Sequence, residues 1–258
     1  MSFLHPKGAD RAHYFVVMKY LLLLLLPLCG CAQGRLEKMP ADLETDWALS
    51  ALPAHLRAEA TVYLLDPAKG YYVAHQGTNG FVCLIGRTEW EWADFRNDLY
   101  TPIAFDPAGA RTIFQVYKDV AEMRAGGYTP HQVRDTVVNR IQRGQYVAPS
   151  RAGISYMLAP LMRIYTGAPG DTNVMTMSMP HYMLYAPYAN NADAGTTYGS
   201  DAPFVSNPGN TVLGDKKGPF GYYICRAPAS VSDKVMADGQ DLLKRLQAYS
   251  PFLCAMKM

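Results

Sequence analysis

The stretch over residues 60–87 constrains the fold most, because it contains three β-rich runs separated by two groups of turn residues. The runs cover residues 60–66, 71–76 and 81–87, and the groups between them read Pro-Ala-Lys-Gly and Gly-Thr-Asn-Gly. Valine, isoleucine, tyrosine and phenylalanine favour strands, and connections this short join antiparallel strands. The stretch therefore predicts a three-stranded β-meander that needs an apolar cover.

Further elements follow from hydrophobic periodicity and from helix-start signals. Asp106 precedes a proline, and Thr129 with Gln132 has the spacing of a capping box. Helices are expected over residues 41–52, 106–126, 129–144 and 230–246, strands over 175–188 and 221–226, and a long loop over 189–218. The apolar pattern over residues 153–166 fits a helix or a strand, and a short helix is favoured. This order predicts an α+β fold, an antiparallel sheet made of the N-terminal β-meander and later strands, with helices packed on one face.

The N-terminal residues 1–31 have the features of an export signal. Lys19 precedes an apolar run over residues 20–28, which is about half the ~20 residues that a membrane-spanning helix needs. We expect translation to start at Met18, directly before this charge. Residues 32–40 are expected to form a polar tether, and residues 41–258 a single domain.

The end of this segment, Leu-Cys-Gly-Cys at residues 28–31, resembles the lipobox of bacterial lipoproteins. The resemblance implies cleavage before Cys31 and attachment of acyl chains such as palmitate to that cysteine. Ala32 follows instead of an aspartate, which implies a membrane anchor on the periplasmic face of the outer membrane. A plain secretory signal cut after Ala32 is the alternative.

The charge balance argues against a nucleic-acid partner. The chain has 24 Lys+Arg and 22 Asp+Glu, but residues 1–30 hold three of the cations and one of the anions. The remaining chain has 21 of each and no net charge, so the basic pI carries no functional meaning. The expected partners are the membrane, through Cys31, and a small molecule or periplasmic protein.

The body of the chain resembles a family of exported bacterial proteins that share a Gly-Thr-Asn-Gly-x-x-Cys segment, here at residues 77–83. Other strings shared in the same order lie at residues 51–54, 60–62, 153–158 and 180–183. The resemblance covers most of residues 50–190 and implies export, but it brings no activity with it. The methionines before residue 180 depart from the family pattern.

Cysteine chemistry is one catalytic hypothesis. Cys83, paired with His181 from another strand, could form a thiolate–imidazole pair for a hydrolase or transferase. Alternatively, Cys83 is bonded to Cys225, or both are buried free thiols. An odd count, with Cys254, leaves at least one thiol unpaired.

A second hypothesis concerns Met175, Met177, Met179, His181 and Met183, which alternate along an expected strand and would share one face. Thioethers and imidazole favour Cu(I), with Met177, Met179 and His181 as ligands. The alternative is an apolar strand face that uses methionine as a gap-filler. No other cofactor is expected.

A third group interleaves acids with aromatic residues over residues 89–98. Two of its carboxylates could act as an acid/base pair, or the loop could form a carbohydrate-binding edge. A charged loop packed by its own aromatic side chains is the simpler interpretation.

The sequence contains no Gly-x-Ser-x-Gly, Walker, His-Glu-x-x-His or Gly-x-Gly-x-x-Gly motif. The leading hypothesis is therefore a lipid-anchored periplasmic domain that binds a ligand or partner without catalysis. Its pocket is expected between the meander and the strand over residues 177–185, lined by Asn79, Tyr156, His181 and Tyr185. The Cys83–His181 enzyme and the copper protein are the alternatives.

Overall fold

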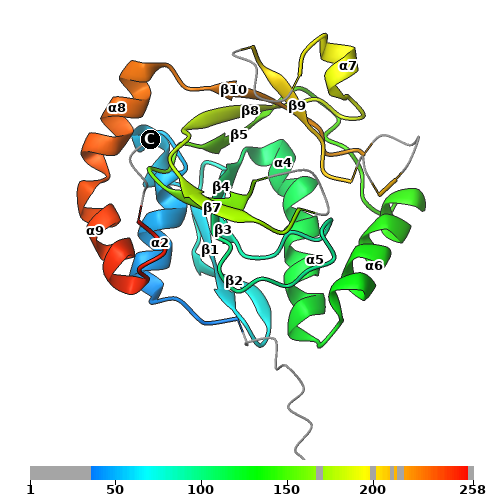
Figure 1. The fold of residues 1–258 in the computed structure, drawn as a ribbon, viewed down its shortest axis with the longest axis horizontal. Helices are drawn as coiled ribbons and strands as arrows, with labels where there is room; N and C mark the ends of the chain where they lie inside the picture. Colours follow the sequence, from blue (N-terminus) through cyan, green and yellow to red (C-terminus); the bar gives the residue numbers. More distant parts are fainter. Residues whose placement is uncertain (1–35, 167–170, 198–201, 210–211, 214–217, 255–258) are drawn as a thin grey trace, which may run out of the picture. The chain divides into compact units, whose positions relative to one another are not determined.

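A computed structural model describes residues 36–254 except 167–170, 198–201, 210–211 and 214–217. Within these residues, one eight-stranded sheet has the order β2-β1-β3-β4-β5-β8-β10-β9 (Figure 1). A smaller sheet pairs β6 with β7. The strands are β1 (Thr61–Asp66), β2 (Gly70–His75), β3 (Val82–Gly86), β4 (Thr101–Phe105), β5 (Ile154–Met157), β6 (Met162–Tyr165), β7 (Val174–Met177), β8 (His181–Tyr185), β9 (Phe204–Ser206) and β10 (Tyr222–Arg226).

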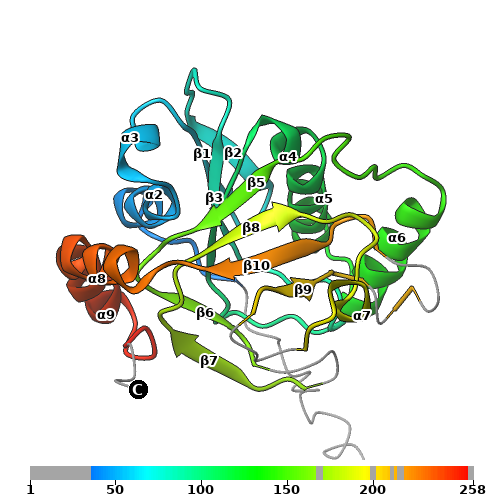
Figure 2. The ribbon, with the colours of Figure 1, turned by 90° about the horizontal axis from the view of Figure 1, so that it is seen from above.

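The helices are α2 (Ala41–Ser50), α3 (Ala54–Arg57), α4 (Pro107–Arg111), α5 (Ile113–Ala125), α6 (Pro130–Gln142), α7 (Asn191–Ala194), α8 (Ala229–Asp238) and α9 (Gln240–Tyr249). The predicted α+β class is confirmed. Helices lie on both faces of the main sheet: α2, α8 and α9 on one side, α5 and α6 on the other (Figure 2). Both faces must be covered because the central strands β3 and β4 are buried at every position.

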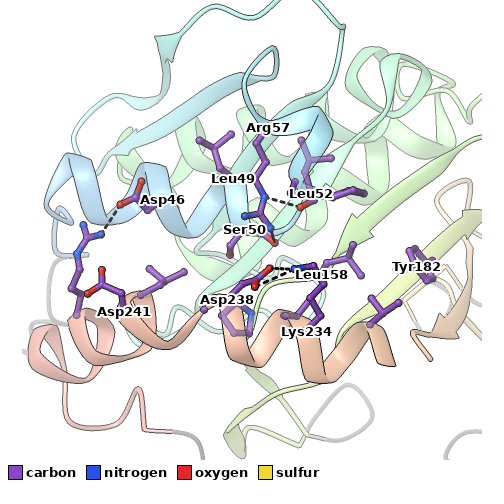
Figure 3. A pocket seen from close by; sticks show the side chains of 18 of the residues that line it. Asp46, Leu49, Ser50, Leu52, Arg57, Leu158, Tyr182, Lys234, Asp238 and Asp241 are labelled. Carbon is purple, nitrogen blue, oxygen red and sulfur yellow. Dashed lines mark hydrogen bonds and ion pairs between the residues drawn. The ribbon is translucent and has the colours of Figure 1, made fainter. Parts of the chain in front are cut away.

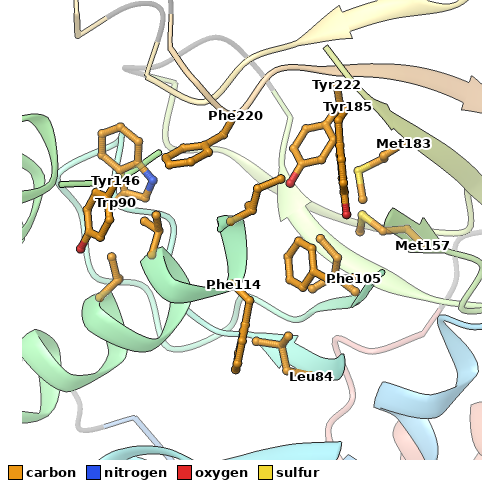
Figure 4. Close-up of a cluster of buried hydrophobic side chains, with 14 of the residues drawn as sticks. Leu84, Trp90, Phe105, Phe114, Tyr146, Met157, Met183, Tyr185, Phe220 and Tyr222 are labelled. Atoms are coloured by element: carbon orange, nitrogen blue, oxygen red, sulfur yellow. The ribbon is translucent and has the colours of Figure 1, made fainter. Parts of the chain in front are cut away.

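The core consists mainly of two layers, one on each side of the sheet. Alternate residues of β3, such as Leu84, face α5 and α6 in a cluster rich in aromatic side chains (Figure 4). The others, such as Ile85, face α2 and α9 and pack with Trp47 and Leu246. The period of two along β3 thus assigns its side chains to opposite layers.

The predicted meander is wrong in one respect. β1 and β2 form the expected antiparallel hairpin, but β3 pairs in parallel with β1 and not with β2. A short connection does force β3 to run antiparallel to β2, but it does not force them to be neighbours. Two strand spacings are only about 9–10 Å, and the six residues 76–81 span that distance across the start of β1.

The Gly77–Gly80 turn explains this crossing. Thr78 N and Asn79 N both donate to the Glu59 carbonyl oxygen, at 2.8 and 3.1 Å, just before β1. Gly77 lies so close to that carbonyl that a Cβ atom would clash with it. The turn is therefore built against the residue that precedes β1, which directs the chain past β1.

The structure differs from the sequence expectations in four other places. Residues 153–166 form β5 and β6 instead of a helix, and β4 was not expected at all. The single strand expected over residues 175–188 is two strands in two sheets, because Pro180 lacks an N–H and interrupts the ladder before β8. The long loop over residues 189–218 contains α7 and β9 among its described residues.

The helix-start predictions are confirmed. Asp106 Oδ1 accepts hydrogen bonds from Ala108 N and Gly109 N at 2.9 and 2.8 Å. α4 begins at Pro107, directly after this capping residue. Thr129 and Gln132 form the reciprocal capping box of α6.

The expected tether is partly packed. Leu36 and Met39 are both buried, Leu36 against Leu65 and Ala121. Residues 1–35, with the predicted signal peptide, the start at Met18 and the acylation site Cys31, lie outside the described residues. Within residues 36–254, as far as described, no helix has the length and hydropathy to cross a bilayer.

Glu44 of α2 generates a prediction about pH. Its carboxyl is buried, Leu65 N donates to its Oε1 at 2.9 Å, and burial raises its pKa to about 7. Because the folded protein holds this proton more tightly than the unfolded chain does, protonation of Glu44 stabilises the fold. This stabilisation is complete below the unfolded pKa near 4.5 and is lost as pH rises through 7. In the unmodified protein, the free energy of unfolding should fall between pH 5 and 8. We expect this fall to be smaller in Glu44→Gln by on the order of 2 kcal/mol, measured by urea unfolding.

Glu37→Gln is the matched control for this measurement, because Glu37 is exposed in the segment that precedes α2. An unchanged pH dependence in Glu44→Gln would show that Glu44 is not the titrating group.

Candidate functional site

A groove of about 510 Å³ lies between α2 and α3 on one side and α8 and α9 on the other (Figure 3). Its size falls within the range of small-molecule sites. Apolar side chains dominate its walls and floor, including Leu49, Leu52, Leu158, Val231 and Val235.

One wall, α2, is fixed to the sheet. Trp47 is fully buried, its Nε1 donates to the Leu161 carbonyl oxygen at 3.0 Å, and its ring stacks on Tyr100. Leu158 N donates to the Ala51 carbonyl oxygen at 3.1 Å, which joins the end of α2 to the chain after β5. These contacts hold the wall and the floor of the groove in one arrangement.

The opposite wall, α8, is different, because none of its ten residues is buried. Val231 and Val235, one helical turn apart, are half-buried and line the groove. Gly239 joins α8 to α9 and sits close to Pro160, where a Cβ atom would lie 2.8 Å from Cγ of the proline. The helix is therefore held at Gly239 and through α9, and its apolar face stays half covered.

The charges of the groove are unevenly paired. Lys234 and Asp238 form an ion pair at 2.9 Å, and Arg245 pairs with Asp42 and Asp46 at 2.9 and 2.6 Å. These pairs are largely solvent-exposed and add little stability.

Arg57 of α3 has no such partner, since no carboxylate of the described residues comes within 4 Å of its guanidinium. Its Nε donates to the Leu52 carbonyl oxygen at 2.9 Å and its Nη2 to that of Ser50 at 3.4 Å. Burial lowers the pKa of Arg57, and Asp238 opposes that shift from a longer distance. The groove thus contains a half-buried cation without an ion pair.

The four residues expected to line a pocket are not brought together. Asn79 donates from Nδ2 to the Leu56 carbonyl oxygen at 2.8 Å and supports the turn before β3. Tyr156 pairs with Tyr182 and packs beside the α2 layer. Tyr185 and His181 lie at odd spacings from Tyr182 on β8, so they face the opposite side of the sheet.

Tyr185 belongs to a buried network instead. Its hydroxyl donates to Asp106 Oδ1 at 2.9 Å and accepts from Ser155 Oγ at 3.1 Å. Gly109 and Gly153 leave room for its ring, since a Cβ atom at either position would collide with it. This network joins β5, β8 and the start of α4.

Cys83 and His181 do not form a pair. The register links Cys83 to Ala104, Tyr156 and Tyr182 across neighbouring strands, three strand spacings or about 14 Å. His181 is adjacent to Tyr182 and faces the other side of the sheet, where its Nδ1 lies 2.7 Å from the Met179 carbonyl oxygen. Burial raises the pKa of the Cys83 thiol to about 12. Cys83, Cys225 and Cys254 are all free thiols, so the alternative of a Cys83–Cys225 disulfide does not hold.

The methionine stripe is divided. Met175 and Met177 lie on β7 in the small sheet, Met179 lies in the connection, and Met183 is buried in the main sheet. Met177 and Met179 pack against the aromatic-rich core layer. Among the described residues, no three His, Cys, Asp or Glu side chains gather as a metal site would require. The copper hypothesis stays a prediction.

The acidic loop is largely packed. Asp98 forms ion pairs with Arg96 and Arg163 at 2.8 and 2.6 Å. Trp92 stacks on Tyr165 with ring centroids 4.6 Å apart. The Glu91 carboxylate accepts from Gly209 N, and burial raises its pKa to about 8.

Sequence reasoning missed the groove. Val235, Leu242 and Leu246 follow one helical pattern, which predicted a single helix over residues 230–246, but the chain breaks at Gly239. That break divides a well-buried helix, α9, from a poorly buried one, α8. No sequence pattern pointed to Arg57 as a groove residue, because it lies in a helix of only four residues.

Comparison with protein-family models, with curated proteins and with solved structures found no match.

Thiol reactivity tests the placement of Cys83. We expect Cys254, which is exposed, to react rapidly with Ellman's reagent at pH 8, and Cys83 to react only after unfolding. The comparison of the native protein with its Cys254→Ser variant assigns the fast phase. Rapid modification of Cys83 in folded protein would contradict the buried position and would revive the enzyme hypothesis.

Proposed function

We propose that this chain is a periplasmic lipoprotein, anchored in the outer membrane through Cys31, whose folded domain binds a ligand with an apolar body in the α2–α8 groove without catalysis. The groove is the observation that carries this proposal. It combines a volume suited to a small molecule with a helix, α8, whose apolar face is only half-buried.

The incomplete burial of α8 supports an occupant. Helices of globular proteins gain most of their stability from packing an apolar face. Val231 and Val235 point that face at the groove but leave it partly in water. A ligand between α8 and α2 would cover both walls at once, at about 25 cal/mol for each Å² of apolar surface removed from water.

The composition of the walls supports binding over catalysis. The groove residues of the described chain include neither a cysteine nor a histidine, and Ser50 Oγ donates to the Trp47 carbonyl oxygen at 2.7 Å. A serine engaged in that bond, without a base beside it, is not activated as a nucleophile.

The location rests on the sequence. The Leu-Cys-Gly-Cys string, the short apolar run before it and the neutral remainder of the chain support acylation and export.

Substitution of Val235 tests the groove. We expect Val235→Glu to weaken binding of the neutral apolar dye N-phenyl-1-naphthylamine at least tenfold, because the carboxylate places charge in an apolar wall. Dye fluorescence gives the affinity, and circular dichroism checks the fold. Val147→Glu is the matched control, since Val147 is exposed outside the groove. Equal affinities in both variants, or no dye binding by the unmodified protein, would contradict the groove as the binding site.

Acylation is tested separately. We expect protein from native membranes to have the mass of a chain that starts at Cys31 and carries acyl groups. Cys31→Ala should abolish both the added acyl mass and the membrane association. Mass spectrometry and fractionation give both results. A native protein with an intact leader and no acyl chain would contradict the proposed location and leave the groove proposal standing.

A further inference from the structure

Arg57 is the feature of the groove that the apolar walls do not explain. Its guanidinium has five N–H groups, and at most two of them donate to backbone oxygens, those of Leu52 and Ser50. The other cations of the groove, Lys234 and Arg245, already have carboxylate partners. Arg57 therefore retains at least two N–H donors that can bind a ligand in the groove.

The donors of Arg57 favour one kind of acceptor. A guanidinium matches a carboxylate in geometry, and charge-assisted hydrogen bonds are stronger than neutral ones. A half-buried cation also has reduced hydration, so an incoming anion replaces less water than it would at the surface. The backbone bonds to Leu52 and Ser50 hold the side chain in place beforehand.

The walls decide what is attached to the carboxylate. Recognition of an extended peptide usually needs free backbone N–H and C=O groups, as at the edge of a sheet. The groove is walled mainly by helices, whose interior backbone groups are hydrogen-bonded within the helix, and Arg57 already occupies the carbonyl oxygens of Ser50 and Leu52 near the end of α2. The apolar side chains of Leu49, Val231 and Val235 line the groove. Such walls suit an alkyl chain, which makes no hydrogen bonds.

We propose that the ligand is an alkyl monocarboxylate of the fatty-acid type, with its carboxylate on Arg57 and its chain between α2 and α8. This inference rests on the proposed groove function and names its ligand class. The groove lining holds three cations, Arg57, Lys234 and Arg245, and three carboxylates, Asp46, Asp238 and Asp241. Asp238 is paired with Lys234, so Arg57 is the cation of this neutral set that keeps donors free for a ligand carboxylate.

The test compares decanoate with decanamide, which has the same chain and no charge, by isothermal titration calorimetry at pH 7 on the folded protein. We expect decanoate to bind at least tenfold more tightly than decanamide. Arg57→Gln should remove this preference while leaving decanamide affinity within about twofold. Arg143→Gln is the matched control, because Arg143 is exposed at the end of α6.

The outcomes are distinguishable. Equal affinities for decanoate and decanamide, both reduced by Val235→Glu, would overturn the carboxylate inference and leave the proposed groove function standing. No binding of either compound, and no dye binding, would overturn both. Tighter binding of an apolar peptide with a free C-terminus than of decanoate would overturn the alkyl assignment. If Arg57→Gln fails to fold, the decanoate–decanamide ratio of the unmodified protein decides alone.

Discussion

The packing of Trp47 is the constraint on which the groove depends. This side chain is fully buried, donates a hydrogen bond to the Leu161 carbonyl oxygen and stacks on the Tyr100 ring. The guanidinium carbon of Arg87 lies 3.9 Å from the centroid of that tyrosine ring. The helix that carries it therefore has one position relative to β1, β3 and β4. A binding wall needs such rigidity, because a ligand that must first order its site loses affinity to the entropy of that ordering.

The opposite wall follows a different rule. α9 buries Leu242 and Leu246 and is anchored in the same core layer, whereas α8, which ends just before Gly239, has no buried residue. Local stability tracks the number of buried apolar contacts, so we expect α8 to open more easily than α2 or α9. A fixed helix facing an adjustable one can accept chains of different length without rearranging the sheet. Arg57 of α3, which bonds to the carbonyl oxygens of Ser50 and Leu52 near the end of α2, is the point at which the carboxylate would be fixed.

Local features such as helix starts could be predicted from the sequence, but the residues that form the groove could not. Capping residues such as Asp106 and Thr129 act over three or four positions, so the helix starts could be read directly. The place of β3 could not, because it depends on a long-range choice: the turn after β2 binds the Glu59 carbonyl and passes β1. The groove was hidden for a similar reason, since its residues come from four helices separated by up to about 200 positions. Burial of Cys83 and His181 in different layers is likewise a property of the sheet register.

The proposed site has a fixed wall in α2, an adjustable wall in α8, and space for an alkyl carboxylate between them. Amide hydrogen exchange of the two helices, with and without saturating decanoate, tests this most directly. We predict that α8 amides in the free protein exchange much faster than those around Trp47, and that decanoate slows α8 with little change in α2. Equal protection of both helices without ligand, or no response of α8 to decanoate, would contradict the account.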